Sequence, residues 1–86
     1  MMRVDKFLKV SRLVKRRTVA KEMCLRGGVF INGRPAKPGT PVQVGDQLDL
    51  RFPYRRLVVQ VRRVSQVPRR EAADPMFTVL SEETLE

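Results

Sequence analysis

The spacing of the apolar residues changes at Gly27-Gly28, and this change constrains the fold more than any other feature of the sequence. Upstream, apolar residues recur three and four positions apart, which is typical of amphipathic helices. These residues are Val4, Phe7 and Leu8, followed by Val19, Ala20, Met23 and Cys24. Downstream, apolar and polar residues alternate, as they do in half-buried strands. The sequence therefore predicts an α+β domain in which two short N-terminal helices precede a small, mostly antiparallel sheet.

The two helices are expected at residues 3–9 and at about 18–26, with a basic connector over residues 10–17. Thr18 has the side chain of an N-cap for the second helix. Gly27-Gly28 is expected to end that helix, because glycine readily adopts the left-handed conformation found there. The stripe from Val19 to Cys24 is expected to face the core, with Cys24 as a buried, unreactive thiol.

The second half of the chain predicts a meander of short strands. Val29–Ile31 precedes Asn32-Gly33, a pair typical of two-residue hairpin turns. The return arm at 34–36 is expected at a sheet edge, because Pro35 has no N–H to donate. Further strands are expected at 48–52, 57–61 and 76–80, with a loop at 65–75. The acidic end, which contains Glu82, Glu83 and Glu86, is expected to be a solvated tail.

The basic residues are concentrated in the first 37 positions. This segment contains 11 Lys or Arg against two acidic residues, a net charge of +9, whereas residues 38–86 contain seven of each and are neutral. Apolar residues make up 42% of the chain, which is enough to build a core. A folded protein with its whole excess charge in one segment is expected to bind a polyanion.

The composition argues against several classes of function. The chain of 86 residues has no His and a single Cys, so it offers no histidine base, no intrachain disulfide and no Cys/His zinc site. We therefore expect no catalytic activity, no cofactor and no bound metal. No apolar run approaches a membrane span, and the first residues do not resemble a secretion signal. We expect a cytoplasmic protein without membrane contacts.

Cations gather around the expected start of the second helix, where free backbone N–H groups also attract anions. Guanidinium groups match the geometry of phosphate oxygens. Aromatic residues are scarce, which argues against recognition of single strands by base stacking and favours structured RNA recognised through its shape and phosphates. Phe30 is left with two alternatives, either exposure to solvent or packing against the C-terminal segment.

Four ordered motifs resemble the S4 RNA-binding domain, also called the alpha-L domain, over residues 3–52. They are Arg3–Leu8, Lys15–Ala20, Gly27 with Val29–Gly33, and Val44–Leu48. Within that superfamily the run Lys6–Thr18 resembles the RqcP family of stand-alone bacterial quality-control factors, with the heat-shock S4 proteins of the large subunit as more distant relations. The resemblance implies an S4-type domain at 1–64, which the loop, last strand and acidic tail at 65–86 complete.

The resemblance also implies a function. Proteins of this family bind the 50S ribosomal subunit obstructed by peptidyl-tRNA and contact 23S rRNA and tRNA. They assist an NFACT-family tailing factor on the same subunit, which adds C-terminal alanines to the stalled chain. The implied role is non-catalytic, and we expect a monomer. The RNA contacts implied here are Arg3, Lys9, Arg12, Lys15, Arg16, Arg17 and Lys21.

Five further residues are secondary candidates for RNA contact: Asp5, Lys6, Ser11, Arg34 and Lys37. Asp5 has two alternative roles, to orient a nearby arginine such as Arg17 or to pair with Lys9 one turn along the helix. Ser11 has two as well, a phosphate contact or a cap of the connector.

Three other functions remain as alternatives. The first is the heat-shock role, rescue of the stalled 50S complex without tailing, although those relatives generally carry a longer basic extension where this chain is rich in Glu. The second is a general binder of structured RNA. The third is an enzyme, because S4 domains are also joined to pseudouridine synthases and tyrosyl-tRNA synthetase, but these need a much larger catalytic domain.

Overall fold

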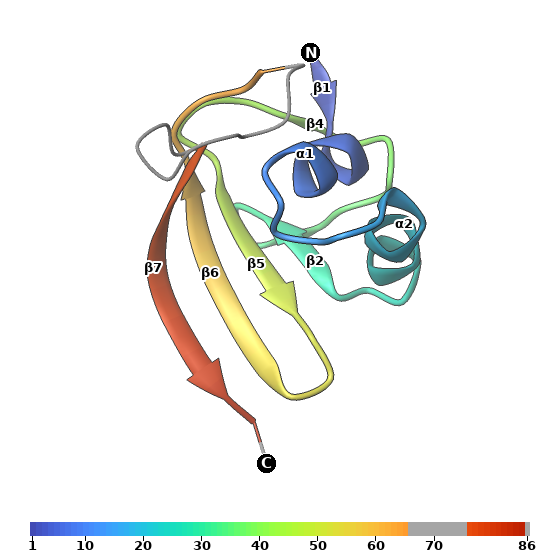
Figure 1. Ribbon diagram of the computed structural model, residues 1–86, viewed down its shortest axis with the longest axis vertical. Coiled ribbons are helices and arrows are strands. Elements are labelled where there is room, and N and C mark those ends of the chain that lie inside the picture. The colour runs from blue at the N-terminus through green and yellow to red at the C-terminus, as the bar shows by residue number, and fades with distance from the viewer. Residues whose placement is uncertain (66–75, 86) are drawn as a thin grey trace.

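Two short helices cover one face of a five-stranded antiparallel sheet in the computed structural model, which describes residues 1–65 and 76–85 (Figure 1). The helices are α1 (Val4–Val10) and α2 (Arg17–Leu25). The sheet contains, in spatial order, β3 (Arg34–Pro35), β2 (Val29–Ile31), β5 (Gln47–Arg51), β6 (Arg55–Val61) and β7 (Phe77–Thr84). The strands β1 (Met2–Arg3) and β4 (Pro41–Val42) form a separate pair. This architecture confirms the predicted α+β class.

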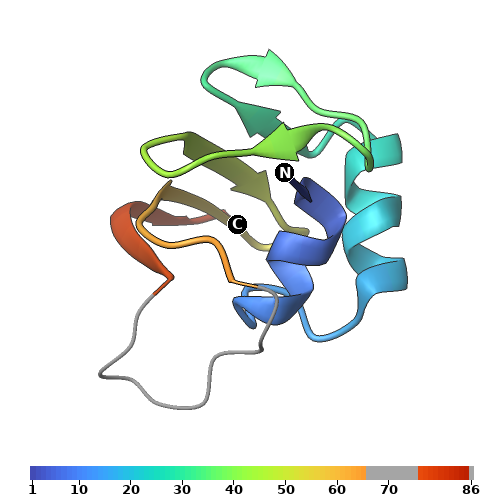
Figure 2. The ribbon, with the colours of Figure 1, turned by 90° about the horizontal axis from the view of Figure 1, so that it is seen from above.

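The two helices lie side by side against the sheet, as the view from above shows (Figure 2). Their apolar stripes form one core with the inward residues of β2, β5 and β6. Fully buried members include Phe7, Leu8, Ala20, Leu48 and Val59. One residue that the sequence predicted to be in the core, Val19, is not buried, and 42% of its surface is exposed. Val19 lies about 100° around the helix from Ala20, which places it beside the buried stripe and not within it.

The sequence predicted the C-terminal end of α2 correctly but not its N-cap. The N-cap is Arg16, with an extended backbone and no side-chain cap, so the prediction of Thr18 as N-cap is wrong. Thr18 lies inside the first turn. The predicted glycine stop is confirmed, since Gly27 has a φ of +77°. The N–H groups of Gly27 and Gly28 donate to carbonyls of the last turn, a Schellman arrangement.

The hairpin between β2 and β3 follows the prediction. Asn32 and Gly33 have φ values of 51° and 84°, as a type I′ turn requires. The Asn32 side chain also donates to Asp46 and accepts the N–H of Gln47, which ties the turn to the start of β5. The strand containing Pro35 lies at the edge of the sheet.

The last strand is longer than the sequence predicted. β7 continues to Thr84, so Glu82 and Glu83 lie opposite Leu57 and Arg56 of β6. Both side chains are solvated as predicted, but the prediction that they belong to a frayed tail is wrong. The cross-strand ion pair between Arg55 and Glu82, at 3.2 Å, helps to extend the pairing. Glu86 and most of the predicted 65–75 loop lie outside the described residues. The strands β1 and β4 were missed, because two residues are too few to show a period.

Candidate nucleic-acid interface

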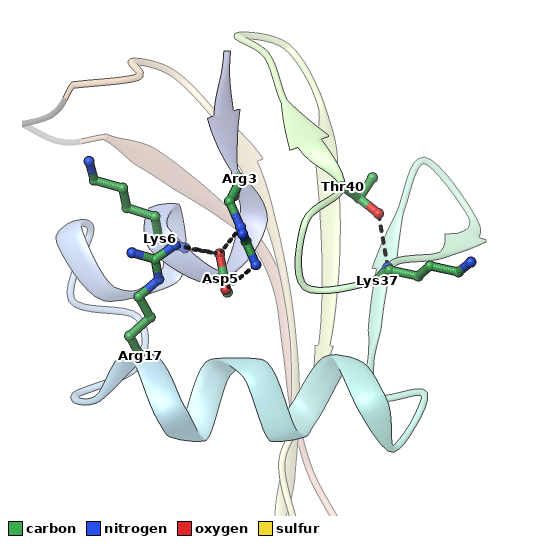
Figure 3. Close-up of polar contacts among 6 residues, drawn as sticks. All are labelled: Arg3, Asp5, Lys6, Arg17, Lys37 and Thr40. Carbon is green, nitrogen blue, oxygen red and sulfur yellow. Dashed lines mark hydrogen bonds and ion pairs between the residues drawn. The ribbon is translucent and has the colours of Figure 1, made fainter.

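Asp5 joins the starts of the two helices. Its side chain is almost fully buried, with 3% of its surface exposed. Its Oδ1 accepts the backbone N–H of Lys6 at 2.8 Å and the Arg3 Nε at 3.2 Å (Figure 3). Arg3 Nη2 donates to Oδ2 at 3.2 Å, and Arg17 Nη2 donates to Oδ1 at 3.4 Å. Asp5 therefore orients Arg17, the first of its two predicted alternatives, and no ion pair joins it to Lys9 among the described residues.

The arginines held by Asp5 still face solvent. The Arg3 and Arg17 side chains are 53% and 47% exposed, so each keeps donors free while its position is fixed. With Thr18 and Lys21 they line a shallow depression of about 300 Å³ between the helix starts. One carboxylate faces three cations here, which leaves an excess of positive charge for an anionic ligand.

A second basic group lies over the end of α1 and the connector. Lys9, Arg12 and Lys15 surround a depression of about 380 Å³. Arg16 lies next to them on the rim of a larger cleft. All four side chains are exposed, and the part of the chain that the structure describes contains no ion pair to any of them or to Lys21. These cations are therefore available to phosphates without first breaking an internal contact.

Arg12 has an unusual backbone for its residue type. Its φ is +66°, in the left-handed region where glycine is the usual residue at a helix end. A side chain longer than hydrogen costs about 1–2 kcal/mol in that region. The chain thus has an exposed guanidinium at a position where glycine would adopt the backbone conformation with less strain.

The secondary candidates are dispersed. Ser11 is fully buried. Its hydroxyl donates to the Leu8 carbonyl at 3.3 Å and receives the N–H of Leu13 at 3.4 Å, which is the loop-cap alternative. Lys6 is half-buried beside Asp5. Lys37 lies away from the Asp5 cluster, with its backbone N–H bonded to Thr40 (Figure 3), and Arg34 is in the edge strand β3.

The sequence did not indicate how the arginines of β5 and β6 are used. Arg56 donates to both oxygens of Asp49, the shortest contact being 2.7 Å, and Arg51 lies 3.8 Å from the same carboxylate. The hydrogen bond from Arg56 holds the pKa of Asp49 below its ordinary value. The Arg51 guanidinium lies 4.8 Å from the centre of the Phe30 ring, so the half-buried Phe30 packs against a residue of β5. Strands β5 and β6 separate Phe30 from β7, the described part of the C-terminal segment.

The single cysteine has the properties of an unreactive thiol. Cys24 is buried as predicted, and burial together with the negative charge of Asp5 raises its pKa to about 11. Within residues 1–65 and 76–85, no three His, Cys, Asp or Glu side chains gather as ligands around a metal would. In the same residues no helix has the length and apolar character to cross a membrane.

The sequence and the fold both match known proteins. The family model described as the S4 domain matches residues 2–48. A protein of Halalkalibacterium halodurans named RQC P-site tRNA stabilizing factor is 48% identical over 98% of this chain and 96% of its own length. The protein of the same name from Bacillus subtilis is 49% identical over 98% of both chains. A solved structure of heat shock protein 15 from Vibrio cholerae, described as trimeric, is similar with a TM-score of 0.83 and 30% identity, over 93% of this chain and 82% of that one.

Proposed function

Because the chain belongs to the S4-domain family and, within it, to the RQC P-site tRNA stabilizing factors, we propose that it stabilises tRNA on an obstructed large ribosomal subunit. In this proposal it binds the 50S subunit that still carries peptidyl-tRNA and contacts both 23S rRNA and the tRNA. It acts in ribosome-associated quality control, in the cytoplasm, and catalyses no reaction.

The observation that carries the proposal is the set of exposed cations on α1, the connector and α2 that form no ion pair within residues 1–65 and 76–85. They are Lys9, Arg12, Lys15, Arg16 and Lys21. They adjoin the two arginines that Asp5 holds in place. Pre-oriented guanidinium groups lose less conformational entropy when they bind phosphate than free side chains do. A surface of this kind positions a folded RNA through its backbone.

The proposed mechanism is positional. The protein would hold the tRNA in a productive place while an NFACT-family tailing factor on the same 50S subunit adds alanines to the stalled chain. The high identity to factors whose name specifies the P-site tRNA supports this reading. A monomer is part of the proposal, and light scattering coupled to gel filtration tests it against the trimer described for the Vibrio protein.

The alternative function is rescue of the stalled 50S complex without tailing, as in heat-shock S4 proteins. The structural similarity to the Vibrio heat shock protein favours it. The higher sequence identity to the tRNA stabilizing factors, over nearly the full length of both chains, favours the first proposal.

Co-sedimentation with purified 50S subunits tests the proposal. We expect the protein to pellet with 50S subunits that carry peptidyl-tRNA, and less with empty 50S, 30S or 70S particles. Arg16→Gln should weaken this binding, whereas Arg51→Gln, which removes the same charge from the outer face of the sheet, should not. Equal binding to all particles would contradict the proposal. If a reconstituted reaction loses alanine tailing when the protein is left out, the result supports the first function over rescue without tailing.

A further inference from the structure

The connector between the helices and the turn between β5 and β6 enclose a cleft of about 610 Å³. Its apolar lining comes from both sides. Leu13, Val14 and Val19 belong to the helical side, and Phe52 belongs to the sheet. Val14 is buried, and Leu13 and Phe52 pack against the core, so the floor is fixed. Val19, which the sequence placed in the core, is 42% exposed to solvent and lines this cleft.

The charged residues that line this cleft in the described part of the chain are all basic. They are Arg12, Lys15, Arg16 and Arg55. Arg12 and Lys15 also line the depression that contains Lys9, so the cleft continues the cationic surface described above. An apolar floor beneath a cationic rim is complementary to a nucleotide, whose base is apolar on both faces and whose phosphate is charged.

Arg55 adds a stacking surface at the mouth. Its Cζ lies 4.7 Å from the centre of the Phe52 ring. Its Nη1 donates to Glu82 of β7 at 3.2 Å, which holds the guanidinium over the ring. The Arg55 side chain is still 47% exposed. Bases in protein complexes with RNA stack on arginine planes as well as on aromatic rings.

We propose that this cleft binds one unpaired nucleotide of the RNA, with its base against Leu13, Val19 and the face of the Arg55 guanidinium that is turned away from Phe52, and its phosphates on the basic rim. The inference rests on the proposed RNA-binding function and extends it, because binding through the phosphate backbone alone does not distinguish an unpaired nucleotide from a paired one. Lys9, Arg12 and Lys15 would then hold the adjoining backbone, and the cleft would select sites where a nucleotide is unstacked.

The sheet contains a matched control for Arg55. Arg51 lies over Phe30 at 4.8 Å, contacts a carboxylate of its own, Asp49, and has a side chain that is 52% exposed. It does not line the cleft. A second pair of variants controls the floor. Val19→Glu places a carboxylate in the cleft, and Leu25→Glu makes the same charge change at an exposed position at the end of α2.

Two RNA hairpins with the same stem provide the probe, one fully paired and one with a single bulged 2-aminopurine nucleotide. Fluorescence anisotropy between 50 and 200 mM salt would give both affinities. We expect the bulged hairpin to bind about tenfold more tightly, a factor within the range of one base-stacking contact. We expect this ratio to stay constant as both affinities fall with salt, because stacking releases no counterions.

Arg55→Gln and Val19→Glu should bring the ratio close to one, and Arg51→Gln and Leu25→Glu should leave it unchanged, with circular dichroism confirming that all four variants fold. If the unmodified protein binds both hairpins with equal, salt-dependent affinity, the proposal that the cleft binds a nucleotide is wrong, and the proposed function is unaffected. An equal loss of the preference for the bulged hairpin in Arg51→Gln and Arg55→Gln would also contradict the proposed role of the cleft. No binding to either hairpin would contradict both proposals.

Discussion

Asp5 and Asp49 each contact two arginines, but the two clusters differ in what they leave free. Asp49 receives a two-point contact from Arg56, the shortest distance being 2.7 Å, on the outer face of the sheet. Asp5 is buried, and its contacts to Arg3 and Arg17, at 3.2–3.4 Å, are longer. Beside the Asp5 cluster lies Lys21, which has no ion pair within the described residues, whereas Arg51 and Arg56 both pair with Asp49.

The protein uses its arginines in two ways. On the sheet, Arg51, Arg55 and Arg56 pair with carboxylates of their own strand or of a neighbouring strand. At the helices, a buried carboxylate fixes two arginines while the rest of the charge stays open to solvent. The segregation of charge along the sequence thus corresponds to a division between the outer-face arginines Arg51 and Arg56, which pair with Asp49, and the cations of the helices and the connector, which are open to a ligand.

The largest expected effect is the dependence of RNA affinity on salt. Six to ten phosphate contacts lose roughly 10³–10⁵ in affinity between 50 and 200 mM salt. Lys15→Gln with Lys21→Gln should lower the slope of log affinity against log salt by about 0.7–0.9 for each lysine. Arg51→Gln with Arg56→Gln should leave the slope unchanged. Filter binding to a tRNA measures both slopes. Equal slopes for the two double variants would show that the cations of the helices and the arginines of the sheet contribute equally to RNA binding.

The second effect concerns the buried carboxylate. Asp5→Asn should lower the free energy of unfolding by about 2–3 kcal/mol, because it removes the charge that holds Arg3 and Arg17 and weakens their hydrogen bonds. Asp49→Asn should cost about 1 kcal/mol or less, since Arg51 and Arg56 remain solvated. Urea unfolding measures both, and a larger loss for Asp49→Asn would reverse the ranking of the clusters.

The third effect tests whether Arg12 is kept for binding at the expense of stability. Arg12→Gly should raise the free energy of unfolding by about 0.5–1 kcal/mol, because glycine has no steric cost at a φ of +66°. The same change should weaken RNA binding. Arg12→Ala separates the two effects, because it removes the charge and keeps the backbone strain. Unchanged affinity in both variants would exclude Arg12 from the interface.

The smallest effect is a dependence of stability on pH. The pKa of Asp49 is lowered in the folded protein, so its contribution to stability is present above its unfolded pKa of about 4 and is lost as the pH falls through the folded value. Asp49→Asn should therefore flatten part of the decline in melting temperature below about pH 4. An identical acid profile in the variant would show that Asp49 titrates normally.

Local signals in the sequence predicted much of the fold. Helical spacing located α1 and α2 to within about one residue, and Asn32-Gly33 and Gly27 determined their turns through backbone conformation alone. The charge pattern identified the candidate interface. Apart from the N-cap of α2, the errors concern features that depend on contacts with other elements. Glu82 lies in β7 because this strand continues its backbone pairing with β6, and Val19 is exposed because it lies beside the stripe that faces the core.

The sequence by itself determined the order of helices and strands, the class of the fold and the sign and position of the excess charge, because these depend on residue spacing and composition. Only the tertiary structure decided which cations have partners. Asp5 and Arg17 are twelve positions apart, and Asp49 and Arg56 meet across two strands, so neither contact follows from a period in the chain. The cleft between Val19 and Phe52 has the same origin, since packing of the helices on the sheet brings distant side chains together.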